Sequence, residues 1–448
     1  MRSALYLLVA AILRAVRILA VPIPATLPED QGAVTTSAAI APPAEFTPNP
    51  NVGPGSRGSF KDSAHFRLYN SPNEAGTAMA LSVLEAVYGC FVEDLGWRSP
   101  GLSFSAGVGD DGPWYKQNIF AAANLGSAGV TVPDFRTGLS YIQVSTDYLR
   151  GDEAMPAAVF SHEYGHSLTM AERNWNLQGS PLDTWFETLG NWFQDLYKTS
   201  DLCEPSRGRH GRKRTETEIN LRKNIGDSYQ TIVDAVGNNA NFYQAWPFLT
   251  YMTYNLDNMA GLGTNTIREM VRQYKQGETP LHTLSRIATN NTVSEIVGRY
   301  WARMSYVDIG HPTAQPLFLG MRSFLNFANY DSAGTNTWRV KSARAPRYMG
   351  SNITPLKKTG AVTVDISIDA GQAIFRATLA VRNTNSGAIR YVTLVDGKGS
   401  ASIEANEETT LVVANAPTTL IVYDPANLQG SPANIGMPYT VTMTGATF

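Results

Sequence analysis

Hydrophobic side chains recur along this chain at two different spacings, and these spacings predict where helices and strands lie. In residues 75–95, Ala78, Leu81, Leu84 and Val87 follow one another every three or four positions, which places them on one face of an amphipathic helix. The same spacing predicts further helices at 154–173, 184–199, 242–258 and 265–274. Branched and aromatic residues predict strands at 65–69 and 138–148.

Near residue 355 the pattern changes to short alternating stretches separated by turn residues. Strands at such short, regular intervals are typical of an all-β sandwich. The stretches are VTVDISI, AIFRATLAV, YVTLV, TTLVVA, TTLIVYD and YTVTMTG. The sequence has no histidine or cysteine after His311. We therefore expect residues 355–448 to form an accessory β-sandwich domain that is structural or binds substrate.

The amino-terminal region predicts export. Arg2 precedes the apolar run 4–13, and a small-residue stretch then ends near Ala20 or Ala25, as in a secretory signal peptide at residues 1–25. Arg14 and Arg17 after the run are unusual, which leaves an uncleaved anchor as the alternative. Residues 26–59 are rich in proline and alanine and predict a linker or short pro-segment. The main domain is expected at residues 60–354.

Charge and cysteine content narrow the choice of function. The formal net charge is -2, whereas a general nucleic-acid-binding protein carries a basic surplus, so we expect no nucleic-acid partner. Cys90 and Cys203 are the only cysteines, and in an oxidising compartment they predict one disulfide. The basic run at 207–214 fits a solvated loop best, with a processing site or a polyanion-binding patch as alternatives.

The chemistry of the chain is concentrated in His162-Glu163-Tyr164-Gly165-His166. On a helix, positions i and i+4 lie on the same face, so both imidazoles can bind one metal ion. Glu163 then lies next to the open coordination position and can accept a proton from water. The helix around this motif is mostly apolar, and buried polar side chains in such a helix need partners. We expect one catalytic Zn²⁺ ion with His162 and His166 as ligands and Glu163 as the general base.

Two glutamates compete for the place of third zinc ligand. Glu187 lies 21 residues after His166 on a predicted helix, among aromatic residues, with Asn191 one turn further on. Glu172 lies six residues after His166, where metzincins place their third ligand. Metzincins need a glycine at the position occupied here by Thr169, and Glu172 is expected at an exposed helix end. Glu187 is therefore the predicted ligand.

The HExxH helix, the downstream glutamate and the polar residue four positions beyond it resemble the gluzincin metallopeptidases. That last residue is often an aspartate that binds the first histidine, and here it is Asn191. The order of HFRLY, a helix ending in LGW, HEYGH, WFE and AWPFLTYM resembles secreted virulence-associated gluzincins of plant pathogens, of the Svx and AvrXca type. The resemblance implies a zincin-like α+β domain with a largely helical active-site half. It also implies extracellular proteolysis, with host cell-wall proteins as the suggested substrate, although no residue identifies that substrate.

Gluzincins commonly use a tyrosine or histidine to stabilise the oxyanion that forms during hydrolysis. The candidates are Tyr243, Tyr251, Tyr254, His210 and His282. The strand predicted at 138–148 is the candidate edge for binding an extended peptide by main-chain hydrogen bonds.

The sequence thus predicts a secreted zinc endopeptidase that acts on proteins or peptides, with no stable membrane insertion after signal removal. A non-catalytic protein of the cell surface or wall with a degenerate metal site is the alternative. The intact Glu163 favours the enzyme, because a decayed site tends to lose its base first.

Overall fold

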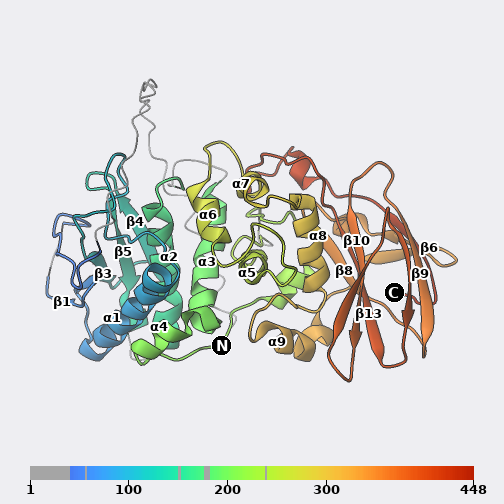
Figure 1. The fold of residues 1–448 in the computed structure, drawn as a ribbon, viewed down its shortest axis with the longest axis horizontal. Helices are drawn as coiled ribbons and strands as arrows, with labels where there is room; N and C mark the ends of the chain where they lie inside the picture. Colours follow the sequence, from blue (N-terminus) through green and yellow to red (C-terminus); the bar gives the residue numbers. More distant parts are fainter. Residues whose placement is uncertain (1–40, 56–57, 150–152, 176–181, 238–239) are drawn as a thin grey trace.

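The computed structural model describes residues 41–55, 58–149, 153–175, 182–237 and 240–448. Figure 1 shows a sheet with helices on the left, further helices in the middle and β-strands on the right. This arrangement confirms the expected α+β class. The expected signal peptide lies outside the described residues.

The first sheet has the strand order β1-β2-β3-β5-β4. Strands β2, β3 and β5 are parallel, whereas β1 and β4 run antiparallel to their neighbours. The bounds are β1 (Phe60–Asp62), β2 (Phe66–Tyr69), β3 (Gln117–Ala122), β4 (Gly129–Asp134) and β5 (Leu139–Ser145). Because β5 is paired on both sides, the expectation that 138–148 offers a free edge is wrong, and the edge strand beside it is β4.

Helices α1 (Glu74–Tyr88) and α2 (Ala154–Ala171) pack on this sheet, and α3 (Leu182–Thr199) packs on α2. Helix α5 (Pro247–Tyr254) is shorter than the expected 242–258. Pro247 favours a helix start, and Asn255 ends the helix in the left-handed conformation with φ 45°. The other α-helices are α4 (Glu204–Arg209), α6 (Thr266–Arg272), α7 (Pro280–Ile287), α8 (Val293–Met304) and α9 (Ala314–Met321).

Part of the predicted linker is packed against the main domain. Phe46 and Val52 are both buried, and the Phe46 ring contacts His65 and Tyr88. Thr47 also forms a parallel bridge with Tyr115. These described residues are therefore docked and do not form a free linker, because two apolar side chains among polar ones are enough to hold the segment; the alternative of a short pro-segment stays a prediction.

Two antiparallel sheets at the carboxyl end face each other across a second apolar core. One has the order β11-β10-β13-β8 and the other β12-β9-β14-β7-β6. Their bounds are β6 (Tyr330–Gly334), β7 (Thr337–Val340), β8 (Ser351–Pro355), β9 (Val362–Asp369), β10 (Arg376–Asn383), β11 (Ile389–Thr393), β12 (Lys398–Ile403), β13 (Glu407–Ala414) and β14 (Thr440–Thr444). The first of these strands begins before the expected boundary at 355, and the predicted strand TTLIVYD (418–424) is irregular.

The β-sandwich is joined to the helices through α8. This helix packs on β10 and β13, and Val412 of β13 belongs to the core of the helical part. Trp301 of α8 donates an indole hydrogen bond to the carbonyl oxygen of Met349 at 2.8 Å. The sandwich therefore shares a core with the helical part.

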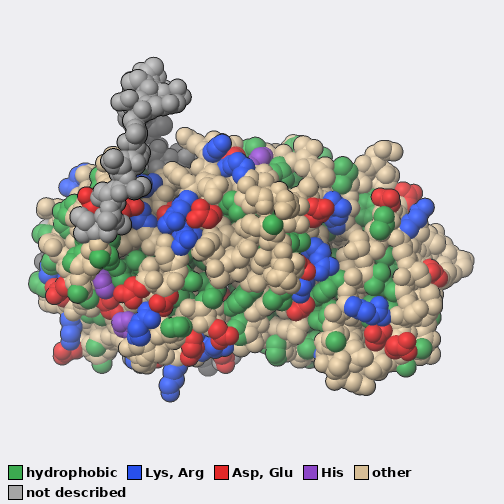
Figure 2. All heavy atoms as spheres, in the orientation of Figure 1, with side chains coloured by type: hydrophobic (Ala, Val, Ile, Leu, Met, Phe, Trp, Pro, Cys, Tyr) green, Lys and Arg blue, Asp and Glu red, His purple; other side chains and the backbone are tan. Residues whose placement is uncertain are grey.

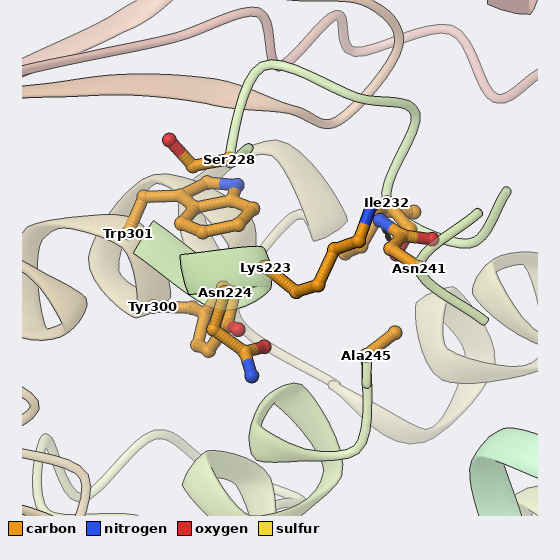
Figure 3. Close-up of a pocket in the computed structure, with 8 residues that line it drawn as sticks. All are labelled: Lys223, Asn224, Ser228, Ile232, Asn241, Ala245, Tyr300 and Trp301. Atoms are coloured by element: carbon orange, nitrogen blue, oxygen red, sulfur yellow. Dashed lines mark hydrogen bonds between the residues drawn. The ribbon is translucent and has the colours of Figure 1, made fainter. Parts of the chain in front are cut away.

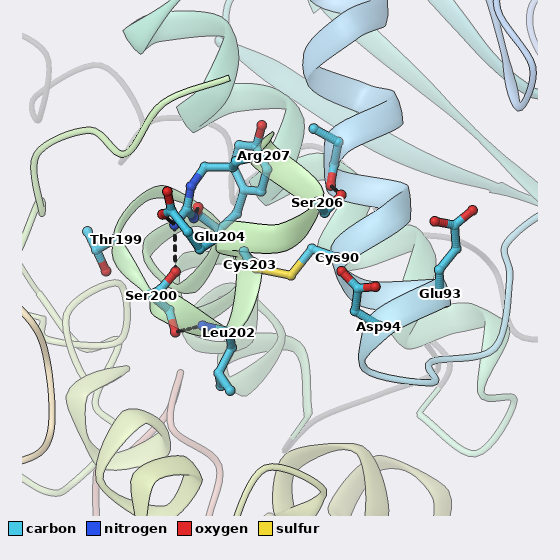
Figure 4. The surroundings of a disulfide bond; sticks show 12 residues. Cys90, Glu93, Asp94, Thr199, Ser200, Leu202, Cys203, Glu204, Ser206 and Arg207 are labelled. Atoms are coloured by element: carbon cyan, nitrogen blue, oxygen red, sulfur yellow. Dashed lines mark hydrogen bonds and ion pairs between the residues drawn. A yellow bond between two sulfur atoms is a disulfide. The ribbon is translucent and has the colours of Figure 1, made fainter. Parts of the chain in front are cut away.

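A disulfide joins Cys90 to Cys203, as the sequence predicted, and both residues are fully buried. Figure 4 shows that it connects the end of the α1 region to the segment that follows α3. Beside it, the buried Arg207 donates to the carbonyl oxygens of Tyr197 and Ser200 at the carboxyl end of α3. The solvated-loop interpretation of 207–214 is therefore wrong for Arg207, whose guanidinium satisfies the last carbonyls of a helix.

One helical stretch in the described part of the chain, Glu74–Asp94, is long and apolar enough to cross a membrane. Its apolar window is 72% buried within the protein, where α1 packs on β2 and α2. The core helix of a folded domain has the same character. Figure 2 shows acidic and basic side chains interspersed over the visible face.

We expect the loss of the disulfide to lower the free energy of unfolding. The bond closes a loop with a sequence separation of 113 residues, and the chain-entropy model assigns about 4–5 kcal/mol to a loop of this length. Chemical unfolding of the Cys90→Ala/Cys203→Ala variant measures the loss. An unchanged unfolding midpoint would contradict this prediction.

Candidate metal centre

Two helices bring the three predicted ligands together. His162 and His166 lie one turn apart on α2, and Glu187 lies on the first half of α3. The two histidine Nε2 atoms are 3.0 Å apart. Glu187 Oε2 lies 3.2 Å from Nε2 of His162 and 3.7 Å from Nε2 of His166. This group could hold a metal ion.

The donor set fits zinc in both type and spacing. Zinc in proteins binds histidine nitrogen and carboxylate oxygen in tetrahedral geometry at about 2.0–2.2 Å. Ligand atoms at that range around one tetrahedral centre are separated by about 3.3 Å. The three separations of 3.0, 3.2 and 3.7 Å lie around this value. Two neutral imidazoles and one carboxylate would leave a fourth position for water, as catalytic sites do.

Two glycines allow the helices to approach closely enough for this geometry. A Cβ atom on Gly190 of α3 would lie 2.7 Å from Cε1 of His162 and 2.8 Å from Cε1 of His166. A Cβ atom on Gly165 of α2 would lie 2.5 Å from the Phe193 ring of α3. Any larger side chain at these positions would push α2 and α3 apart. Gly190 was not among the predicted site residues, although its place between Glu187 and Asn191 on a predicted helix was a usable signal.

The ligands strongly perturb one another. Burial lowers the pKa of His162, but the hydrogen bond to Glu187 and its charge outweigh burial and raise it to about 9. Burial raises the pKa of Glu187, yet the same hydrogen bond leads the effects that lower it to about 2. Burial lowers the pKa of His166 to about 3. At neutral pH Glu187 is therefore a carboxylate and His166 a neutral imidazole, both in the form that binds metals, whereas His162 must release a proton when a metal binds.

The two histidines are held in different ways. His162 Nδ1 lies 2.9 Å from Oδ1 of Asn191, the polar residue four positions after Glu187 on α3. His166 instead stacks on the Phe186 ring, with centroids 4.2 Å apart and an interplanar angle of 7°. Nδ1 of His166 is buried and has no hydrogen-bond partner among the described residues. One ligand is thus oriented by a hydrogen bond and the other by ring packing.

Glu163 lies between α2 and the edge strand β4. The Thr131 hydroxyl of β4 is 2.8 Å from Oε2 of Glu163 and 2.7 Å from its backbone carbonyl oxygen. Gly129 of β4 packs against the same carboxyl group, because a Cβ atom there would lie 2.8 Å from Oε1. Burial raises the pKa of Glu163 to about 7, although the charge of His162 opposes this shift. A group with a pKa near 7 can both accept and return a proton at neutral pH.

Glu172 is directed away from the metal ligands. Its carboxylate accepts from Arg272 at 2.6 Å and from the backbone N–H of Arg98 at 2.8 Å. Its side chain is only 3% exposed, so the expectation of an exposed helix end is wrong. The alternative in which Glu172 completes the site is not supported by these contacts, which use it to fasten the end of α2.

Of the five oxyanion candidates, Tyr243 is the one that contacts the cluster. Its hydroxyl group interacts with Glu187, and its ring lies 6.5 Å from that of His162. Burial and the nearby Glu187 charge raise the pKa of Tyr243, so the hydroxyl stays protonated. The other four have partners elsewhere: Tyr251 binds Asp257, Tyr254 binds Ser200, His282 caps α7 and His210 follows α4 near Ser82.

Two hollows in the described part of the protein lie away from this cluster. The one drawn in Figure 3 has a volume of about 10 Å³, room for at most one water molecule, and lies beside Asn224 and Trp301. The other is an open apolar groove on the β-sandwich beside Tyr348 and Met437. Neither contains a predicted site residue.

The chain matches a known protein family over most of its length. Residues 78–448 match a family of unknown function, DUF6055. The chain belongs to this family. The matched region includes α2, α3, Tyr243 and the whole β-sandwich, so the candidate site and the sandwich are both within the DUF6055 match. No match to a curated protein was found.

The two glutamates should respond differently to truncation. Glu187→Ala removes one of three ligands and should abolish most zinc binding while the protein stays folded. Glu172→Ala should keep zinc binding but lower stability by about 1–3 kcal/mol, because it leaves the backbone N–H of Arg98 and the partly exposed guanidinium of Arg272 without this acceptor. Zinc titration and thermal unfolding of both variants check this, and zinc loss in Glu172→Ala alone would reverse the assignment.

Gly190→Ala should weaken zinc binding without unfolding the protein. Alanine is favoured over glycine inside a helix by about 1 kcal/mol, so only the added methyl group near the two imidazoles is harmful. Gly208→Ala on α4 is the matched control, since a Cβ atom there meets nothing within 4 Å. Chelator competition measures both affinities. Equal affinity in the two variants would show that helix separation does not limit the site.

Proposed function

We propose that this DUF6055 protein is a secreted, zinc-dependent endopeptidase with a zincin-like site of the gluzincin type. The observation that carries the proposal is the convergence of His162, His166 and Glu187, with Glu163 next to them in the chain. A glutamate beside an open metal position is the arrangement that HExxH peptidases use. The resemblance in the sequence supports the same function.

The chemistry follows from the groups around the cluster. Zinc bound by His162, His166 and Glu187 would act as a Lewis acid, which lowers the pKa of a water molecule and polarises a carbonyl group. Glu163 accepts the proton of the attacking water and later returns it to the leaving amine. Thr131 holds the Glu163 carboxyl group in place during both transfers.

Tyr243 is the proposed donor to the developing oxyanion. Its raised pKa keeps the hydroxyl hydrogen available, and its position beside Glu187 brings it to the metal side of the cluster. A pre-positioned donor of this kind contributes about 10²–10³ in kcat in other hydrolases.

The edge strand β4 is the proposed binding surface for the peptide. Among the strands that the structure describes, β4 pairs only with β5, so its other edge has backbone groups available for a peptide strand. Gly129 and Thr131 of β4 both contact Glu163. A peptide paired with β4 would therefore pass close to the general base.

Export and substrate are proposed from the sequence. The signal-peptide pattern and the Cys90–Cys203 disulfide both fit an oxidising, extracellular compartment. The resemblance to virulence-associated peptidases suggests host cell-wall proteins as substrates. Digestion of such proteins by the purified enzyme, with and without a chelator, tests the substrate class.

Glu163→Gln is the sharpest test of the mechanism. The amide can still bond to Thr131, so the fold and zinc content should stay near those of the wild type, whereas peptidase activity should fall at least about 10²-fold because the amide cannot accept a proton. Zinc quantification and digestion of an unfolded protein substrate measure the two properties.

Glu74→Gln is the matched control, because the Glu74 side chain is 89% exposed at the start of α1. It should keep full activity. Chelation should remove activity from the wild type, and added zinc should restore it. Full activity in Glu163→Gln, or activity that survives complete zinc removal, would contradict the proposed function.

A further inference from the structure

Asn191 lies between two parts of the proposed active site. Its Oδ1 atom is 2.9 Å from Nδ1 of His162, and its Nδ2 group donates to the backbone carbonyl oxygen of Tyr243. One turn earlier on α3, the Thr188 hydroxyl donates to the carbonyl oxygen of Phe242 at 2.6 Å. Two consecutive carbonyls of the segment before α5 are thus held by side chains of the helix that carries Glu187.

The Tyr243 carbonyl determines which way the Asn191 amide points. A backbone carbonyl can only accept hydrogen bonds, so the NH₂ group must face it and Oδ1 must face His162. Oδ1 is also only an acceptor, so Nδ1 of His162 must carry the proton. Nε2 faces His166 and Glu187, and the proton that it shares with the Glu187 carboxylate is the one that a metal would replace, which leaves the Nδ1–H tautomer that a metal-bound histidine needs.

We propose that Asn191 is a positioning residue that couples the zinc ligand His162 to the oxyanion donor Tyr243. This inference rests on the proposed peptidase function and adds to it a reason for asparagine at a position where gluzincins often have aspartate. An aspartate would accept the His162 proton equally well, but its second oxygen would face the Tyr243 carbonyl oxygen. Two acceptors at hydrogen-bond distance repel each other, and the Tyr243 segment would lose one of the two hydrogen bonds that hold its backbone carbonyls to α3.

The test is Asn191→Asp, compared with Asn191→Ala. Asn191→Asp should bind zinc at least as tightly as the wild type, because His162 keeps an acceptor for Nδ1. Its kcat should fall about 10–100-fold with little change in KM, as expected when a supporting side chain is lost. Asn191→Ala should lose about 10–100-fold in zinc affinity as well. Both variants should show faster hydrogen exchange in residues 240–247.

Asn73→Asp is the matched control. Asn73 caps α1 through Oδ1, which accepts from the Gly76 N–H, so a carboxylate serves there equally well. This variant adds the same charge and should leave zinc affinity, kcat and hydrogen exchange unchanged. A similar loss in Asn73→Asp would show that charge alone is responsible and would overturn the proposal.

A double-mutant cycle with Tyr243→Phe isolates the coupling. If Asn191 acts by placing the Tyr243 hydroxyl, Asn191→Asp should lower kcat no further in the Tyr243→Phe background. Wild-type kcat in Asn191→Asp, or an effect of the same size in both backgrounds, would overturn the proposal. A wild-type protein that hydrolyses no peptide would instead refute the peptidase function, while zinc affinity and hydrogen exchange would still show whether Asn191 orients His162 and tethers Tyr243.

Discussion

The close approach of α2 and α3 is the constraint on which the candidate site depends. Each helix presents a glycine where the other would otherwise collide with it: Gly165 faces Phe193, and Gly190 faces the two imidazoles. Glycine inside a helix costs about 1 kcal/mol relative to alanine, and this cost is accepted twice at one interface. Without these contacts, the Glu187 carboxylate could not reach the two histidines. The site is therefore a property of the helix pair and not of either helix alone.

Helix α3 also connects this helix pair to other segments in the middle of the molecule through its polar side chains. Glu187, Asn191 and Asp195 lie one turn apart, and each contacts a different segment. Glu187 contacts the histidines, Asn191 contacts Tyr243, and the buried Asp195 accepts from Nε2 of His311 at 2.6 Å. Nδ1 of His311 accepts two backbone N–H groups, which fixes its tautomer as the donor to Asp195. One polar face of α3 thus links the proposed metal ligands to the segment between α8 and α9.

The β-sandwich is joined to the helical part by polar as well as apolar contacts. Asp257, just after α5, accepts hydrogen bonds from Arg299 and Arg303 of α8. Both arginines also lie over the Tyr391 ring of β11, at 4.9 and 5.3 Å. Removing one partner of such a pair would leave a charge without its counter-ion, which is costly where the group is buried. The helix α5 that follows Tyr243 is therefore held close to the sandwich.

The sequence by itself was enough to select the residues of the candidate site. Helical spacing was enough to place His162 and His166 on one face, and the aromatic residues around Glu187 were enough to prefer it over Glu172. The cysteine count was also enough to predict the Cys90–Cys203 disulfide. These features depend on short-range periodicity and composition, which a single sequence contains.

Only the tertiary structure decided which distant groups meet. The edge strand β4 was hidden in a glycine-rich stretch, and Tyr243 could not be separated from Tyr251 and Tyr254 because all three fit one predicted helix. Glu172 looked exposed because its partner Arg272 lies 100 residues away in the chain. Long-range packing decides the strand order, the hydrogen bonds that Asn191 makes to a distant segment, and ion pairs of this kind. No local pattern in the sequence predicts them.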